Sequence, residues 1–319
     1  MKRLLIYLGI ALLVTAGLSR LDTDPKVSVG VRATQTKHAI KADVKATAAM
    51  VKSAAVSPDA CYKCHDDQVD SYNRTTHAHT WKAELGCENC HGDVTKHMET
   101  NGAPGTIVSA KNLSAQQLSN TCLKCHERGG EQSHARMSEH AQAGVSCVNC
   151  HEVHPSKEKK MDNAVAGKSA MLVKSQSELC LSCHTKVAAD FDKPTHHRLR
   201  EGVLDCTSCH NPHGTDQPHQ LRTTTKELCT QCHQDKRGPF MFEHNASDGD
   251  GCIACHDTHG SSAKHMLKLR DPRKLCVSCH SKEMGKGVPH GRVSLQESGD
   301  CTRCHTEIHG SNKDQYFTE

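Results

Sequence analysis

Apolar residues are concentrated at the start of the chain, from Leu4 to Leu18. Lys2 and Arg3 precede this run, and the small residue Ala16 lies near its end. A basic start, a short apolar run and a small residue predict a secretory signal peptide over residues 1–18, cleaved after Ala16. The run is shorter than the 18 or more apolar residues typical of a membrane-spanning helix. An uncleaved membrane anchor is the alternative interpretation.

Residues 19–58 contain no cysteine and few large apolar side chains. Their apolar positions recur at helical spacing: Ile40, Val44, Ala48, Val51 and Ala55. This pattern predicts one amphipathic helix that ends at Ser57-Pro58. A solvated tether is the other interpretation of so polar a segment.

All 20 cysteines fall in ten Cys-x-x-Cys-His units, the attachment signature of c-type haem. Positions i, i+3 and i+4 share one face of a helical turn, so two thiols meet one porphyrin edge and the histidine binds its iron. We therefore expect ten covalently bound haems. The thioether cysteines are Cys61, Cys64, Cys87, Cys90, Cys122, Cys125, Cys147, Cys150, Cys180, Cys183, Cys206, Cys209, Cys229, Cys232, Cys252, Cys255, Cys276, Cys279, Cys301 and Cys304. The proximal iron ligands are His65, His91, His126, His151, His184, His210, His233, His256, His280 and His305.

Other cysteine chemistries explain the pattern less well. A disulfide framework suits an even cysteine count in an exported chain, and zinc ribbons use paired Cys-x-x-Cys. Neither needs a histidine after every second cysteine. A thioredoxin-like motif occurs once per domain beside a βαβ pattern, which the sequence lacks.

The composition supports a core filled by haem. Only 3% of the residues are aromatic, and the 35% counted as hydrophobic includes the cysteines. Few large side chains remain to bury, so we expect the porphyrins to supply the apolar interior and the chain to unfold without them.

The ten units form five pairs. The second unit of a pair starts 23 to 26 residues after the first, as from Cys229 to Cys252 and from Cys61 to Cys87. Pairs recur every 47 to 61 residues, a period typical of quasi-linear arrays. The predicted fold is mostly irregular with short α-helices under the motifs, no sheet, and an elongated linear array of five di-haem repeats. We place this decahaem domain at residues 59–312 and a C-terminal tail at 313–319.

Sixteen of the 26 histidines lie outside the motifs, and ten of these recur before or after the second unit of each pair. They are the expected distal ligands: His77, His97, His140, His154, His197, His213, His244, His259, His290 and His309. His79 is an alternative to His77. A motif histidine and the histidine three residues later cannot easily bracket one iron, so we expect His154, His213 and His259 to ligate a neighbouring haem. The other histidines, among them His134, His196, His219 and His265, are assigned to the surface.

Charge adds little. The formal net charge is +4, and the lysine clusters also contain acidic residues, as in Lys157-Glu158-Lys159-Lys160. This pattern does not indicate nucleic-acid binding.

Four sequence pieces resemble one known family. They are CHQDKRGP followed by Glu243-His244, CHNPHG at 209–214, CHDTHGS at 255–261, and CHTEIHGSN at 304–312. Over about residues 58–312 the chain resembles the MtrA/DmsE-type decahaem cytochromes, which include PioA- and MtoA-like proteins. The resemblance implies that the expected distal histidines from His97 onward are iron ligands.

The resemblance also implies a location and a role. We expect an exported protein of the Gram-negative periplasm and outer membrane, inserted in a porin-like β-barrel of the MtrB type. There it would carry electrons to or from periplasmic or inner-membrane cytochromes, and to or from an extracellular multihaem cytochrome or terminal reductase. We therefore expect an electron carrier and not an enzyme. A soluble periplasmic shuttle and a multihaem reductase of a small oxyanion are the alternatives, and the second would need an iron with an open position.

Overall fold

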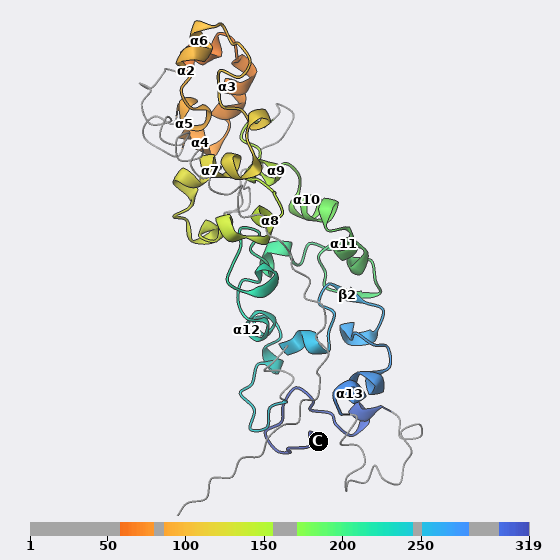
Figure 1. Cartoon of the computed structure of the whole chain (residues 1–319). Helices are drawn as coiled ribbons and strands as arrows, with labels where there is room; N and C mark the ends of the chain where they lie inside the picture. Colours follow the sequence, from red (N-terminus) through yellow and green to blue (C-terminus); the bar gives the residue numbers. More distant parts are fainter. Residues whose placement is uncertain (1–57, 80–85, 156–170, 245–250, 281–299, 319) are drawn as a thin grey trace, which may run out of the picture. The chain divides into compact units, whose positions relative to one another are not determined.

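The computed structural model describes residues 58–79, 86–155, 171–244, 251–280 and 300–318, which all belong to one unit of the chain, residues 47–319. The expected signal peptide, the 19–57 part of the predicted tether or helix, and His290 lie outside the described residues. Short helices alternate with irregular stretches (Figure 1), as the sequence predicted. The longest described helix is α7, Ala115–His126, with 12 residues.

The helices follow the order of the motifs. The first pair contains α2 (Pro58–Tyr62), α3 (Asp66–Asn73), α4 (Thr76–His79), α5 (Glu88–His91), α6 (Thr95–Glu99) and η1 (Ala110–Asn112). The second contains α7, η2 (Gly130–Gln132), η3 (Ala135–Met137), α8 (Glu139–Gln142) and α9 (Cys147–Cys150). The third contains α10 (Gln176–Cys183), α11 (Thr185–Phe191), β1 (Thr195–His196), η4 (Cys206–Ser208) and η5 (Pro218–Gln220). The fourth contains α12 (Thr225–Thr230), η6 (Gln234–Lys236), η8 (Gly251–Ala254), β2 (Gly260–Ser261) and η9 (Lys264–Met266), and the fifth contains α13 (Pro272–His280) and η11 (Cys301–Arg303).

Each motif is one helical turn that closes on itself. The backbone N–H of the motif histidine donates to the carbonyl of the first cysteine, at 2.8 Å from His151 to Cys147 and 2.9 Å from His305 to Cys301. This i to i+4 bond places both thiols and the imidazole on one side of the turn. The first motif of a pair generally lies on an α-helix, such as α7, which begins with a capping box between Ser114 and Gln117. The second motif lies on a single short turn, such as α9 or η11.

The structure contains a small sheet that the sequence did not predict. Strands β1 and β2 pair antiparallel, with Thr195 opposite Ser261 and His196 opposite Gly260. Two-residue strands are too short to produce an alternating pattern, which is why periodicity missed them. At Gly260 a Cβ atom would clash with the Asp190 carbonyl oxygen, so only glycine fits this approach.

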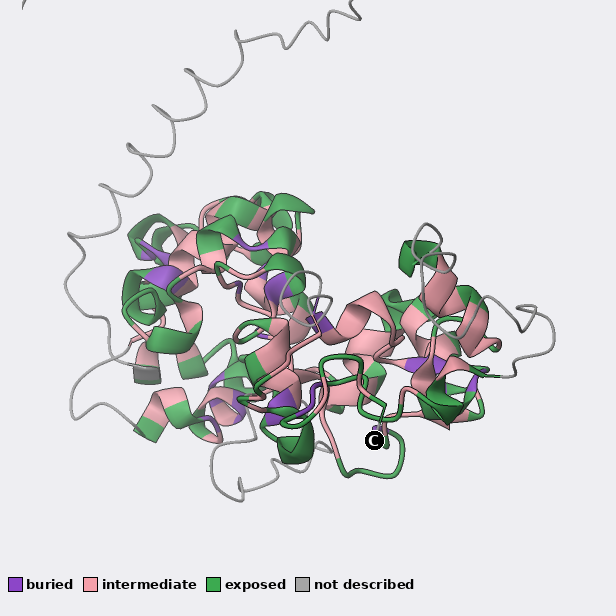
Figure 2. Ribbon diagram, turned by 90° about the horizontal axis from the view of Figure 1, so that it is seen from below, coloured by how far each residue is buried: buried purple, intermediate pink, exposed green. Residues whose placement is uncertain are grey.

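Few side chains are fully buried. Among the described residues, the buried hydrophobic ones are Val69, Val94, Leu123, Phe191, Leu199 and Ala263. Figure 2 shows buried residues scattered among half-buried and exposed ones. This thin apolar interior agrees with a core that cofactors fill. Among the described segments, none is a helix with the length and apolar character needed to cross a membrane.

Candidate haem sites

Histidine rings meet in nine pairs, and each pair joins a motif histidine to one of the expected distal histidines. Their ring centres lie 5.9–6.4 Å apart. The pairs are His65–His97, His91–His154, His126–His77, His151–His213, His184–His140, His210–His259, His233–His197, His256–His309 and His280–His244. Below, each site is named by its motif histidine.

This separation fits one metal atom between two imidazoles. A metal–nitrogen bond of about 2 Å plus about 1.1 Å from nitrogen to ring centre, on both sides, gives ring centres about 6.2 Å apart. A direct nitrogen–nitrogen hydrogen bond of about 3 Å would bring the centres to about 5.2 Å. Zinc would need about four protein ligands; within the described residues, no three His, Cys, Asp or Glu side chains cluster to hold a metal. Two imidazoles suit an iron whose other four ligands come from a porphyrin.

The tenth motif histidine is His305. Its Nδ1 lies 2.5 Å from the Tyr316 carbonyl oxygen. Its expected partner, His290, lies outside the described residues.

The structure separates His77 from His79. The ring of His77 lies 5.9 Å from that of His126, whereas the Nε2 of His79 lies 2.6 Å from the Asn73 carbonyl oxygen. Nε2 of His79 therefore contacts the backbone instead of facing a metal. His77 is the candidate iron ligand at this site.

Seven of the paired rings are oriented by a contact between Nδ1 and an oxygen atom. A hydrogen bond donated by Nδ1 fixes the tautomer that leaves Nε2 free for a metal. The contacts join His91 to Val108 O (2.8 Å), His97 to Thr106 Oγ1 (3.0 Å), His140 to Pro212 O (3.0 Å), His154 to Gln68 O (3.2 Å), His197 to Thr258 O (2.6 Å), His210 to His219 O (2.9 Å) and His256 to His265 O (2.8 Å).

Burial favours the neutral form of several expected distal histidines. Partial removal from water is the main cause that lowers the pKa of His77, His154, His213, His244, His259 and His309. Neutral imidazole is the form that binds a metal. The environment therefore favours the protonation state that ligation requires.

The thiols link consecutive motifs into an unbroken series. Within each pair, the first cysteines of the two motifs are hydrogen-bonded: Cys61–Cys87, Cys122–Cys147, Cys180–Cys206, Cys229–Cys252 and Cys276–Cys301. Burial, followed by the bond to Cys61, raises the pKa of Cys87 to about 11. Between pairs, burial is the main cause that raises the pKa of Cys90, Cys150, Cys209 and Cys255, and a further cause is the nearby second cysteine of the following motif: Cys125, Cys183, Cys232 and Cys279, respectively. Each motif thus adjoins the next along the sequence.

Known proteins share these features. Residues 196–238 and 244–285 match the family model of the doubled CXXCH motif, and residues 87–168 match the cytochrome c-type protein NrfB-like model. The multihaem cytochrome MtrA of Shewanella baltica (strain OS185) is 32% identical over 331 aligned residues, which cover 98% of this chain and 96% of that protein. The chain belongs to the MtrA family of multihaem cytochromes. The resemblance seen in the motifs is confirmed, and with it an electron-transfer protein that carries covalently bound c-type haem.

In this MtrA-family chain, the ring pairs cross between motif pairs. Of the nine, only His65–His97 lies within one pair. Each junction between neighbouring pairs is spanned twice, once in each direction along the chain. The crossing ring pairs are His77–His126 and His154–His91, His140–His184 and His213–His151, His197–His233 and His259–His210, and His244–His280 and His309–His256. The structure thus places His154, His213 and His259 beside motif histidines of the preceding pair.

Two histidines assigned to the surface contribute through their backbone. His219 and His265 adopt positive φ angles of 56° and 57°. Their carbonyl oxygens lie within hydrogen-bond distance of Nδ1 of His210 and His256. The signal in the sequence was the interval, since a histidine follows the motif histidine by nine residues in both places.

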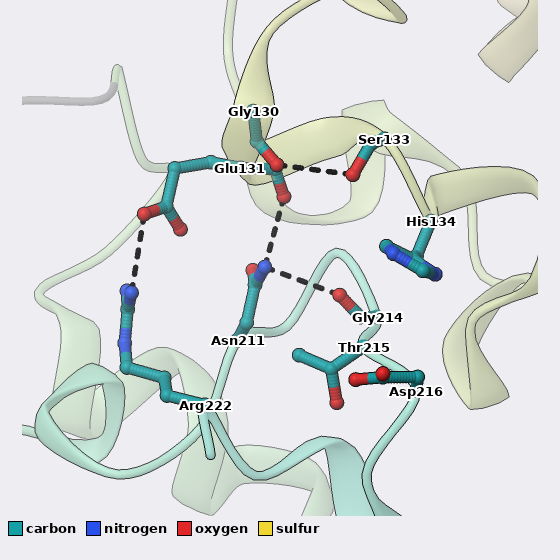
Figure 3. Close-up of a pocket in the computed structure, with 9 residues that line it drawn as sticks. All are labelled: Gly130, Glu131, Ser133, His134, Asn211, Gly214, Thr215, Asp216 and Arg222. Atoms are coloured by element: carbon teal, nitrogen blue, oxygen red, sulfur yellow. Dashed lines mark hydrogen bonds and ion pairs between the residues drawn. The ribbon is translucent and has the colours of Figure 1, made fainter.

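A polar cluster holds the loop of His213 against the preceding pair (Figure 3). The side-chain amide of Asn211 donates to the carbonyl oxygens of Glu131 (2.9 Å) and Gly214 (3.1 Å), and its oxygen accepts from the backbone N–H of His213 (3.1 Å). Arg222 donates to the Glu131 carboxylate at 3.1 Å. Asn211 is 7% exposed, so these bonds are shielded from water and fix the distal ring at the His151 site.

The segment expected to be a tail also reaches the sites. The Tyr316 carbonyl contacts the ring of His305, and the ring of Phe317 lies 5.9 Å from that of His244 in an edge-on arrangement. These residues carry no motif, and no feature of the sequence identified them.

Proposed function

We propose that this chain is a decahaem electron conduit in which every iron has two histidine ligands. Nine sites use the ring pairs described above, and the tenth uses His305 with His290. The haems supply the redox centres, and the chain is an electron carrier without a catalytic site of its own. The five pairs are the repeating units of the conduit.

The observation that carries this proposal is the series of nine ring pairs within the described residues, together with the adjoining thiols of consecutive motifs. The rings of nine motif histidines each lie 5.9–6.4 Å from an expected distal ring, the separation that one metal atom between two imidazoles would give. The cysteines that would hold the porphyrins adjoin at every step along the sequence. Such a chain keeps neighbouring redox centres close while its side chains complete the coordination of each iron.

We further propose that the conduit crosses the outer membrane inside a porin-like β-barrel of the MtrB type. The family resemblance supports this partner. Physical chemistry supports a sheath for any crossing, because irregular polar backbone cannot face lipid without losing several kcal/mol for each unpaired group. A closed barrel would cover the sides and leave the ends to periplasmic or inner-membrane cytochromes and to an extracellular redox partner. Both the exported location and the conduit role follow from this arrangement.

The proposal is tested in liposomes that contain a reducible dye and receive external reductant. Dye reduction should require both this chain and a porin-like β-barrel protein of the MtrB type. The barrel alone and the chain alone are the controls. Transfer by the barrel alone, or failure of the two proteins to co-purify, would contradict the conduit and favour a soluble periplasmic shuttle.

The spin state tests the carrier role separately. Iron with two histidine ligands should be low-spin in both redox states. A high-spin, ligand-binding haem in the native protein would contradict full histidine ligation and favour reduction of a small oxyanion instead.

A further inference from the structure

One backbone position recurs after four of the second motifs and always has a left-handed conformation. Its occupants are Met171, Gln220, Met266 and Phe317, with φ angles of 49°, 55°, 56° and 60°. We call it the hairpin position. The carbonyls of Met171, Gln220 and Met266 accept hydrogen bonds of 2.7–2.8 Å from the residue after the motif histidine. Gln220 is the one hydrogen-bonding side chain among the four occupants.

At two of the four hairpin positions, the side chain lies against a histidine of the preceding motif pair, which is the expected distal ligand of a first-motif site. The amide nitrogen of Gln220 lies 3.5 Å from Nδ1 of His140, which pairs with His184. The ring of Phe317 lies against His244, which pairs with His280. Two occupants of equivalent positions thus contact equivalent rings.

The surroundings of Gln220 call for a different rotation of its amide. The side chain is 8% exposed, and its Oε1 is buried without a hydrogen-bond partner. Nδ1 of His140 lies 3.0 Å from the Pro212 carbonyl oxygen, so this nitrogen carries the proton. The oxygen and nitrogen of a glutamine amide exchange places by a half-turn. With Oε1 toward His140, the buried oxygen gains a donor and Nδ1–H faces two acceptors.

We propose that Gln220 is a second hydrogen-bond acceptor for His140 and lowers the reduction potential of the His184 site. A stronger acceptor on the far side of an imidazole makes the ligand more basic, which stabilises oxidised iron. Met171 and Met266 offer only the weak acceptor of a thioether, and Phe317 offers none. The haem at the His184 site, in the third pair, therefore has a lower reduction potential than it would have with the occupants found at the His126, His233 and His280 sites. This inference rests on iron ligation by His140 and His184, and it does not depend on the barrel.

The test is a potentiometric titration of the purified full-length protein, followed by visible absorption. In Gln220→Met, which installs the residue found at 171 and 266, one of the ten haem transitions should move to higher potential. In Met266→Gln, one transition should move to lower potential, because Nδ1 of His197 donates to Thr258 as that of His140 does to Pro212. Met266→Leu is the matched control and should leave the curve unchanged.

Haem content and spin state are measured first in every variant. A high-spin haem in the native protein would contradict the ligation on which the proposed function stands. Ten low-spin haems with unchanged titrations in both variants would overturn the role of Gln220 alone. If Gln220→Met assembles poorly, Met266→Gln decides, since it leaves Gln220 in place and an unmoved curve contradicts the inference.

Discussion

The ring of His154 lies 6.3 Å from that of His91, although the two residues belong to different motif pairs. The ring of His151, three residues before His154, instead faces His213. A substitution of His154, which follows the fourth motif, should therefore change the coordination of the iron at the second motif.

We expect His154→Ala to produce one high-spin haem, located at the His91 site. Magnetic resonance and visible spectra of the oxidised protein would detect it. In the same variant, replacing Cys87 and Cys90 by serine should abolish the signal, because the affected haem is no longer attached. Replacing Cys147 and Cys150 should leave the signal in place. The opposite pattern would mean that His154 serves the His151 site.

The contrast between His77 and His79 gives a second test. His77→Ala should create one high-spin haem at the His126 site, because the ring of His77 faces His126. His79→Ala should leave all haems low-spin, because Nε2 of His79 is used by the Asn73 carbonyl. The same spectra check both variants, and a high-spin centre in His79→Ala alone would reverse the assignment.

Replacement of His244 separates ligand loss from ligand exchange. His244→Ala should give one high-spin haem at the His280 site. His244→Met should keep that haem six-coordinate and raise its potential, because Met/His ligation favours reduced iron. Potentiometric titration checks the second result, and a lowered potential would exclude methionine binding.

Asn211 should stabilise the junction between the second and third pairs. We expect Asn211→Ala to lower the free energy of unfolding by about 1–3 kcal/mol, the range for buried hydrogen bonds lost without replacement. Denaturation followed by circular dichroism measures this change. Asp216→Asn, in the same polar cluster but exposed, is the control and should change stability by less than about 0.5 kcal/mol. Equal effects of the two variants would remove the special role of Asn211.

The cofactor count and the expected cleavage after Ala16 are checked by intact mass spectrometry of the protein purified from its native host. We expect residues 17–319 with ten haems and no thiol that reacts with an alkylating agent. A count of eight or fewer, with reactive thiols in place of the missing haems, would contradict the ten-site interpretation.

Much of the local structure could be predicted because it depends on short intervals. The five-residue motif specifies its own helical turn, and the recurring histidines identify which rings are available. Which ring meets which could not be predicted, because the partners are far apart in sequence, as with His151 and His213. Spacing excludes only partners that are too near, such as His154 for His151.

The backbone contributions had one signal in the sequence, the nine-residue interval from the motif histidine to His219 and His265, but this interval does not show that their carbonyl groups make the contact. The carbonyls of His219 and His265 orient two motif histidines only because both residues adopt left-handed angles, which propensity disfavours for histidine. Phe317 reaches His244 through the fold of the last residues, and no periodic pattern marks such a contact.

The crossing ring pairs constrain how such a chain can change length during evolution. An internal pair gives one histidine to each neighbour and takes one from each. Excision of the whole third pair would leave His151 without His213 and His233 without His197, but it would also free His259 and His140 to take their places. Loss of a single motif allows no such replacement and leaves one distal histidine without an iron to bind. The array can thus be lengthened or shortened by duplication or deletion in steps of two haems, so that the number of haems stays even.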